Sequence, residues 1–318
     1  PKYNPLDSDM LLDDALDALA TQQEKDSLKN IVTTTNIQKN FSISNAKIDI
    51  STESHPMPYD PANFSFNYAH SSQFSMGETT MWEKTETWKL DAGYDYSPVY
   101  EPFGPFQNIK DKSGWLKIIQ DFRLNWLPQN ISLSSDMTRT YYELQERDMD
   151  NLSDQSIPLS FSSDFLWNRH MSINWDLTNN IHASLSTGTN AEVEQPYSPV
   201  NKSLYPDEYS VWKDSVWRSI SHFGRPLAYS QSFNLSWKVP IDLIPAFQWA
   251  SADFAYDATY GWERGAVLED NSTLGNTINN NRNIRINSRF NLEELYNMVP
   301  YLQKVNKYFA SKGSGRSV

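Results

Sequence analysis

The alternation of apolar and polar residues is clearest between residues 159 and 177, in the segment LSFSSDFLWNRHMSINWDL. Counting from Leu159, every second residue is mostly large and apolar, whereas the residues between them are mostly small or polar. Because successive side chains of a strand point to opposite faces, this pattern predicts a β-strand with one apolar and one polar face. Strands usually have about 5–6 residues, so the predicted strand is about three times the usual length.

The same alternation recurs along most of the chain between residues 31 and 309, and it indicates about nine or ten long strands. The further segments with this pattern are 63–70, 88–97, 130–137, 180–187, 227–240, 249–263 and 284–292. A β-sandwich would also bury one face of each strand, but it needs short strands with a turn about every 8–12 residues. The length of these segments therefore argues against a sandwich.

Composition narrows the fold class further. The mean hydropathy is low, at -0.63, and no apolar run reaches the ~18 residues of a membrane helix. The chain nevertheless carries 11 Trp, 17 Tyr and 15 Phe. A transmembrane β-barrel explains both facts, because each lipid-facing residue alternates with a lumen-facing one. We therefore expect an all-β fold, an antiparallel transmembrane β-barrel segment with short amphipathic helices at its rims.

The two alternating sets of residues then receive different roles. The residues expected to contact lipid are Phe165, Trp167, Trp175, Leu235, Trp237, Phe254 and Tyr256. The residues expected to line the lumen are Ser162, Asp164, Ser184, Ser186, Ser230, Ser232, Asn234 and Asp257. About 9–11 tilted residues cross a bilayer, so roughly half of the 159–177 segment is expected to project beyond it.

The connections between strands indicate an orientation. Long polar loops are expected at 143–157, 192–226 and 264–277, whereas the junctions at 178–180 and 240–245 are short. Outer-membrane barrels have longer extracellular loops and short periplasmic turns. The three long loops are therefore predicted to lie outside and the two short junctions in the periplasm.

Helical spacing appears in four places. Residues 1–30 form a lead-in that places Leu12, Leu16 and Leu19 on one face, with Ser8 or Asp9 as possible caps; this helix is expected to pack on the barrel or on a plug. Short helices are also predicted at 113–122, and at 292–309 with a break at Pro300, on the periplasmic rim.

The loop around YPDEYSVWKDSVWRSISHFGRP has an apolar stripe of Trp212, Val216 and Ile220. Such spacing predicts a helix. The helix is expected to pack on the extracellular rim or inside the lumen, and the alternative is a docking surface for a partner subunit.

Charge and reactive residues point away from several functions. The formal net charge of -12 argues against nucleic-acid binding. The absence of cysteine excludes disulfides and thiolate metal sites, and the five histidines have no metal-ligand spacing. The carboxylate pairs 13–14 and 293–294 are better explained as solvated helix ends than as a divalent-ion site. No enzymatic activity, cofactor or metal is expected.

Several longer stretches carry a resemblance to a known family. They are YNPLDSDMLLDDALDALATQQEKDSLKNIV, PMPYDPANFSFNYAHS, IIQDFRLNWLPQNISLSSDMTR, GRPLAYSQSFNLSWKVPIDLIPAFQW and LGNTINNNRNIRINSRFNLEELYNMVPYLQKVN. With their ordered LP, IP and L-Y-N-x-V-P-x-L junctions, they resemble the SprA/Sov family of Bacteroidetes over nearly the whole chain, apart from the last several residues.

That family forms the outer-membrane translocon of the type IX secretion system, which exports folded cargo and, in gliding species, adhesins. The resemblance implies a place in the bacterial outer membrane, with lipid, secreted cargo proteins and other type IX secretion subunits as partners. The largest known barrels have about 36 strands, a size that fits this family and follows from the resemblance alone. The chain is then expected to be an interior fragment of a much larger barrel. Its parts would be a helical lead-in at 1–30, the barrel segment at 31–309 and a flexible tail at 310–318.

Two other functions stay open. A polar lumen wall suits any wide barrel, so the chain could belong to a different outer-membrane transporter, such as one for nutrients. The second alternative is a soluble β-rich surface protein, which would lack a lipid-facing surface.

Overall fold

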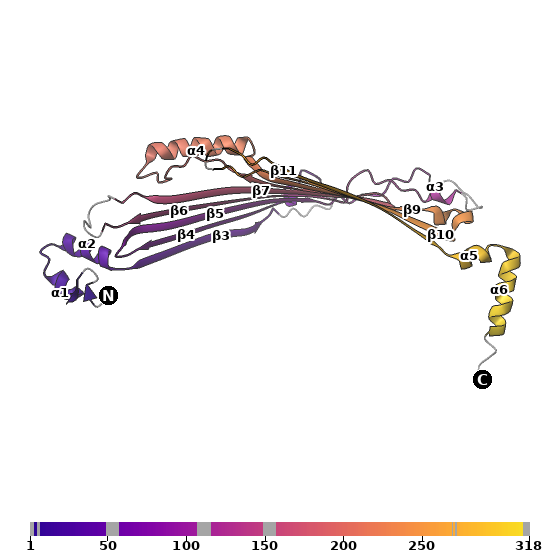
Figure 1. Ribbon diagram of the computed structural model, residues 1–318, viewed down its shortest axis with the longest axis horizontal. Coiled ribbons are helices and arrows are strands. Elements are labelled where there is room, and N and C mark those ends of the chain that lie inside the picture. Colours follow the sequence, from indigo (N-terminus) through magenta and orange to yellow (C-terminus); the bar gives the residue numbers. More distant parts are fainter. Residues whose placement is uncertain are drawn as a thin grey trace.

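The computed structural model describes residues 3–4, 7–48, 57–106, 116–148, 157–268, 270 and 272–313. Its main element is a nine-stranded antiparallel sheet in which every strand pairs with its neighbours in the sequence, from β3 at one edge to β11 at the other (Figure 1). This confirms the all-β antiparallel class and the expected number of strands. The sheet is not closed on itself, so β3 and β11 are both edge strands.

The strands have 12 to 19 residues, which is far above the usual length of about 5–6. They are β3 (Thr35–Ala46), β4 (Phe64–Met76), β5 (Thr80–Tyr96), β6 (Asn130–Glu146), β7 (Ser160–Thr178), β8 (Ile181–Glu192), β9 (Arg225–Val239), β10 (Ala250–Glu263) and β11 (Thr277–Phe290). The segment with the clearest alternation is β7, the longest strand. β6 extends to Glu146, so the loop expected from residue 143 begins later.

The connections between these strands fall alternately at two ends of the sheet, because each strand runs opposite to the one before it. One end, here called the α4 end, carries the connections from β6 to β7, from β8 to β9 and from β10 to β11. The opposite α6 end carries those from β7 to β8 and from β9 to β10 (Figure 1). The three loops predicted to lie outside are thus at one end, and the two junctions predicted to be periplasmic are at the other.

Loop length alone does not separate the two ends. β4 and β5 are joined at the α4 end by a tight turn in which the Gly77 amide donates to the Thr80 carbonyl at 2.9 Å. Two long connections, 47–63 and 97–129, lie at the α6 end. The junction between β9 and β10 consists of the 3₁₀ turns η2 (Ile241–Leu243) and η3 (Pro245–Phe247), and η1 (Pro61–Asn63) precedes β4.

The N-terminal region differs from the single helix expected there. It contains β1 (Tyr3–Asn4), β2 (Asp7–Leu11), α1 (Leu12–Asp17) and α2 (Gln22–Val32). The expected caps Ser8 and Asp9 lie within β2, and α1 has no side-chain cap. α1 ends at Asp17, before Leu19, whereas Thr21 and Glu24 form a capping box that starts α2. The competing cap at Thr21 explains why the helical pattern is split in two.

The C-terminal region has the predicted break. α5 (Leu292–Asn297) is followed by α6 (Pro300–Gly313), with Pro300 at the first helical position, where its missing N–H costs nothing. Because α6 continues to Gly313, the first part of the expected flexible tail is helical, and residues 314–318 lie outside the described residues. Among the described residues of the 97–129 connection, the helix that forms is the short α3 (Lys117–Gln120), and Trp115 lies outside the described residues.

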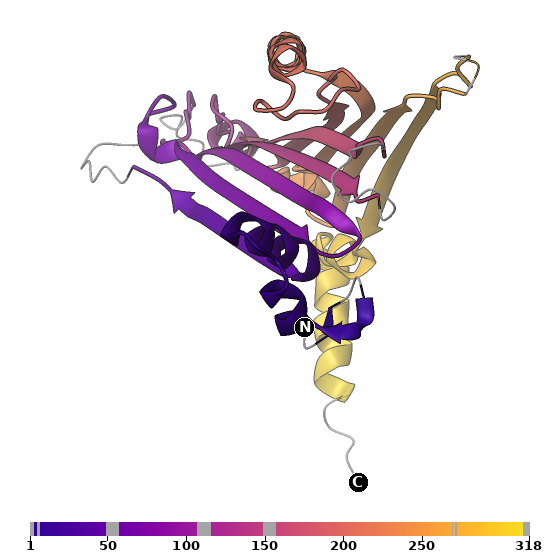
Figure 2. The same cartoon turned by 90° about the vertical axis from the view of Figure 1, so that its left-hand side faces the viewer.

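α4 (Pro206–Ser221) lies over one side of the sheet, and α1 and α6 lie toward the other side, near opposite ends of the strands (Figures 1 and 2). Within the described part of the chain, no helix is both long and apolar enough to cross a bilayer.

Candidate functional site

The sheet sorts the predicted lipid-facing residues onto one face. Directly paired residues of adjacent strands share a face, and one such row runs from Trp175 through Ala183 and Leu235 to Tyr256. Trp237 pairs with Phe254 in the next row. Phe165 and Trp167 are separated from Trp175 by even numbers of residues on β7, so they lie on the same face as Trp175. All seven residues therefore lie on one surface, here called the apolar face.

The predicted lumen-facing residues share the opposite surface, here called the polar face. Ser184 pairs with Asn234, which pairs with Asp257, and Ser186 pairs with Ser232. Ser230, Ser162 and Asp164 have the same parity on β9 and β7. Some of these side chains pair with one another: the Asn234 amide donates to Ser184 Oγ at 3.4 Å, and Arg285 lies 2.8 Å from Asp257. Contact of either face with lipid or with a lumen stays a prediction.

Two rows of aromatic residues cross the apolar face. Four strands contribute one aromatic residue to each row, and on each of these strands the two residues are eight positions apart. The pairs are Trp88 and Tyr96 on β5, Trp167 and Trp175 on β7, Tyr229 and Trp237 on β9, and Trp262 and Phe254 on β10. Eight residues of strand span about 26 Å. Transmembrane barrels have an apolar band about 25 Å tall between two aromatic girdles. Sequence analysis missed these rows, because they appear only when the strands are aligned by their pairing.

The rows are slanted relative to the direction of strand pairing. Starting at Tyr96, direct pairing leads through Ile131, Ile173 and Leu185 to Phe233 on β9. The aromatic residue of that row on β9 is Trp237, which is four residues farther along and four strands away.

The same slant occurs at intermediate strands and in the second row. On β7, two strands from β5, Trp175 is two residues beyond Ile173. In the row toward the α4 end, Trp88 pairs through Arg139 with Phe165, and Trp167 is again two residues beyond. Between β9 and β10 the aromatic residues pair directly, without a shift. From β5 to β9 the shift averages one residue per strand, and about 3.3 Å per strand spacing of about 4.8 Å corresponds to a tilt of about 35°. Strands of transmembrane barrels tilt by about 35–45°.

Part of the apolar face is covered by α4. Val216 of α4 packs with Trp167 and Val193 in a buried cluster, against which Phe165 and Trp212 also pack. Trp212, Val216 and Ile220 thus face the sheet, as the predicted stripe requires. Phe165 and Trp167 pack beneath this helix instead of facing lipid as expected, because the connection between β8 and β9 folds back over the α4 end of the apolar face. Trp217 points away and is 62% exposed.

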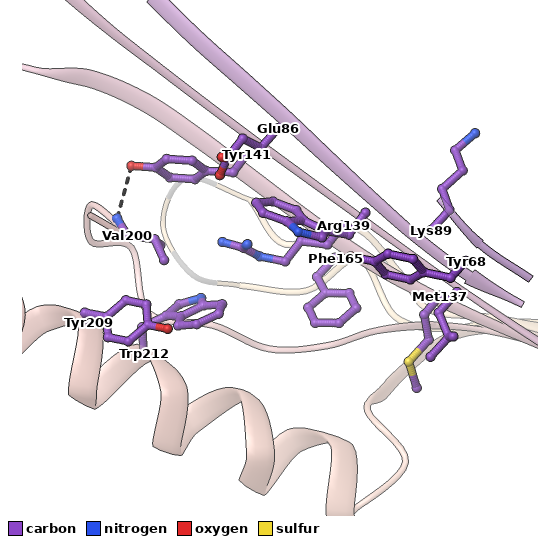
Figure 3. Close-up of a pocket in the computed structure, with 12 residues that line it drawn as sticks. Tyr68, Glu86, Lys89, Met137, Arg139, Tyr141, Phe165, Val200, Tyr209 and Trp212 are labelled. Carbon is purple, nitrogen blue, oxygen red and sulfur yellow. Dashed lines mark hydrogen bonds between the residues drawn. The ribbon is translucent and has the colours of Figure 1, made fainter. Parts of the chain in front are cut away.

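A cavity of about 500 Å³ lies between α4 and the sheet (Figure 3). Its most unusual residue is Arg139, a charged residue on the apolar face that is only 8% exposed. The guanidinium carbon of Arg139 is 4.7 Å from the ring centre of Trp88 on the sheet and 4.5 Å from that of Trp212 on α4. These cation–π contacts hold the helix against the sheet. The sequence analysis did not single out Arg139. A charged residue at a position of the alternation that belongs to the apolar face could have identified it.

Tyr141 closes one side of the cavity. Its hydroxyl accepts a hydrogen bond from the amide of Val200 at 3.0 Å (Figure 3). The same hydroxyl donates to Glu143 Oε2 at 3.0 Å. The Tyr141 side chain is buried, and these two hydrogen bonds satisfy its hydroxyl. The connection that precedes α4 is thereby anchored to β6.

The polar face carries two of the five histidines, His170 and His182. His170 pairs with Ser134 and Gly188, and His182 Nδ1 lies 2.5 Å from Asp176. Among the described residues, no three His, Asp or Glu side chains gather as they would around a metal ion.

We expect Val216→Asp to detach α4 from the apolar face. Val216 is 7% exposed, and loss of a buried valine contact costs at least about 1.5 kcal/mol. Protease cleavage within residues 193–224 should then accelerate on the order of tenfold, because cleavage follows the population of the open form. Val211→Asp on the same helix is the control, since Val211 is 61% exposed. Equal cleavage of the two variants would contradict the packing described here.

No protein-family model matches this chain, and a search of curated proteins finds no significant match.

Proposed function

We propose that this chain forms part of the wall of a large outer-membrane β-barrel that conducts folded proteins, as in the translocons that the SprA/Sov family provides for type IX secretion. The resemblance of the sequence to that family supports the choice of cargo. The apolar face would contact lipid and the polar face would line the pore. In this role the chain carries out no catalysis.

The observation that supports a membrane barrel most strongly is the pair of slanted aromatic rows. Aromatic side chains favour the two membrane–water interfaces, where a ring meets both lipid and water. In the row toward the α4 end, Tyr229 and Trp262 would lie at such an interface, whereas Trp88 and Trp167 pack beneath α4. After correction for the tilt of about 35°, rows eight residues apart are separated by about 22 Å across the membrane. Both the tilt and the tilt-corrected spacing are close to the values of transmembrane barrels.

The apolar face also argues against the soluble alternative. Between the rows, Leu90 is 43% exposed and Leu133 is 41% exposed, and near the β11 edge Ile284 and Ile286 are 58% and 69% exposed. A continuous apolar surface of this kind aggregates in water unless lipid or another protein covers it. Outside the part under α4, the described residues provide no such cover.

The polar face suits passage of a protein. Its Ser, Asn and Asp side chains hold water, and a wall without apolar patches gives a passing chain nothing to adhere to. A nutrient transporter could have a similar wall, so the choice between the two rests on the resemblance and on the tests below.

Fractionation of cells that produce the protein tests the membrane assignment. The protein should stay in the outer-membrane fraction after alkaline extraction and should migrate differently on gels before and after heating. Depletion should then stop export of a folded type IX cargo. Release by alkali would favour a soluble surface protein, and loss of nutrient uptake with normal export would favour a transporter.

Orientation can be measured by cysteine labelling, because the chain contains no native cysteine. With a membrane-impermeant maleimide on intact cells, Ser203→Cys at the α4 end should react and Asn179→Cys at the α6 end should not. Both residues are exposed, so access to the reagent depends on the side of the membrane. Labelling at residue 179 alone would reverse the assigned orientation.

A further inference from the structure

The cavity under α4 is apolar at one end and charged at the other. Its apolar lining includes Leu90 and Met137 of the sheet, and the exposure of Leu90 shows that the cavity reaches the open part of the apolar face. At the other end, Arg139 lies in the same row as Trp88 of the aromatic row toward the α4 end. A ligand that fits this site would be apolar toward the membrane and anionic at its surface.

Arg139 has unused hydrogen-bonding capacity in this cavity. Its Nε and Nη2 atoms are buried and have no hydrogen-bond partner in the described part of the chain. Trp88 and Trp212 both stack against the guanidinium, which leaves the N–H groups at its edge as the remaining donors. Buried donors of this kind are costly unless an acceptor binds them, and a charged acceptor binds best.

Glu86 acts electrostatically on Arg139 but forms no ion pair with it in the described structure. Glu86 lines the cavity, but its ion pair is with Lys84 at 2.9 Å. Glu143 accepts its hydrogen bond from Tyr141. Among the described residues neither carboxylate forms an ion pair with Arg139, and Lys89 points away from the cavity (Figure 3). The guanidinium therefore keeps its positive charge available for an anion.

A second arginine repeats the arrangement on the adjacent strand. Arg169 on β7 stacks at 4.6 Å on the ring of Trp167, and its Nε atom also lacks a partner in the described structure. It lines a cavity of about 610 Å³ together with Phe66, Leu133 and Met171 of the apolar face. Two cavities are thus each lined by an arginine that is stacked on tryptophan.

We propose that the cavity under α4 binds a phosphate-bearing lipid of the outer leaflet, with the phosphate accepting hydrogen bonds from Arg139 and an acyl chain lying over Leu90 and Met137. This inference rests on the proposed function, in which the apolar face contacts lipid. The bound lipid would complete the contact between α4 and the sheet, so that the helix is held at the membrane surface.

Native mass spectrometry of the full chain in detergent tests this site without any mutation. The probes are phosphatidylglycerol and phosphatidylcholine with identical acyl chains, and inorganic phosphate as a competitor. Phosphatidylglycerol should bind at least about tenfold more tightly than phosphatidylcholine, because the phosphate of phosphatidylcholine is neutralised by its own choline group and that of phosphatidylglycerol is not. Equal binding of the two lipids would overturn the proposal. Displacement of the lipid by millimolar inorganic phosphate would identify a site for free anions instead.

Arg139→Gln then locates the preference. The variant should bind the two lipids within about twofold of each other, whereas Arg218→Gln, at an exposed arginine of α4, should keep the full preference. An unchanged preference in Arg139→Gln would rule out this cavity. Heat-modifiability of each protein on gels monitors assembly of the barrel separately. If the unmodified protein assembles but binds the two lipids equally, this inference is contradicted while the proposed pore is not.

Discussion

Replacement of Phe233 by arginine is expected to prevent assembly of the protein in the outer membrane. Phe233 lies on the apolar face of β9, four residues from each aromatic row, which places it at the middle of the proposed membrane span. An arginine on a lipid face at the midplane costs about 2–4 kcal/mol. The yield of heat-modifiable protein in the outer-membrane fraction should fall accordingly.

Asn234→Arg is the matched control for this substitution. Asn234 is adjacent in the same strand, is exposed and belongs to the polar face. A charged side chain there would extend into water, so assembly should remain near the level of the unmodified protein. Equal defects from both variants would show that the two faces do not have the different environments proposed here.

Replacement of five residues of the polar face by leucine is expected to stop the passage of cargo while leaving the barrel assembled. The variant replaces Ser184, Ser186, Ser230, Ser232 and Asn234, which form one patch across β8 and β9. Each leucine that contacts a passing chain would add about 1 kcal/mol of adhesion, so several together would hold cargo for long times. Secretion of a type IX cargo should fall at least about tenfold, measured in culture medium against the amount of heat-modifiable barrel.

The control for the leucine wall keeps the same five positions polar. Threonine in place of each serine and glutamine in place of Asn234 enlarge the side chains without making them adhesive, so export should continue. Normal secretion through a correctly assembled leucine variant would argue that cargo does not pass along this face. A defect in both variants would indicate a steric effect at the wall.

The strands and their two faces could be predicted from sequence because parity is a local property. In every strand that was predicted, the apolar and polar residues alternate as they do in the sheet, and pairing brings Trp175, Leu235 and Tyr256 into one row as expected. The slanted rows could not be predicted, because they depend on how far each strand is shifted relative to the next. That shift is set by connections whose conformation the alternation does not specify.

Tertiary packing explains the other differences. Nothing in the alternation of β7 distinguishes Phe165 and Trp167, which α4 covers, from Trp175, which it does not. The N-terminal helix was divided because the capping box of Thr21 and Glu24 starts a new helix inside the apparent pattern. Arg139 was overlooked because its environment is built by Trp212, which is far away in the sequence.

The tilt of the strands also determines how much of a pore this sheet can surround. Tilted by about 35°, each strand occupies about 6 Å of circumference, so nine strands provide about 53 Å of wall. A folded domain of about 100 residues has a radius of gyration of about 13 Å and a diameter of about 34 Å. A barrel that admits it, with room for side chains, needs a circumference of about 140 Å, or about 24 strands. In the proposed translocon the edges at β3 and β11 must therefore both continue into further strands, and this sheet would form less than half of the ring.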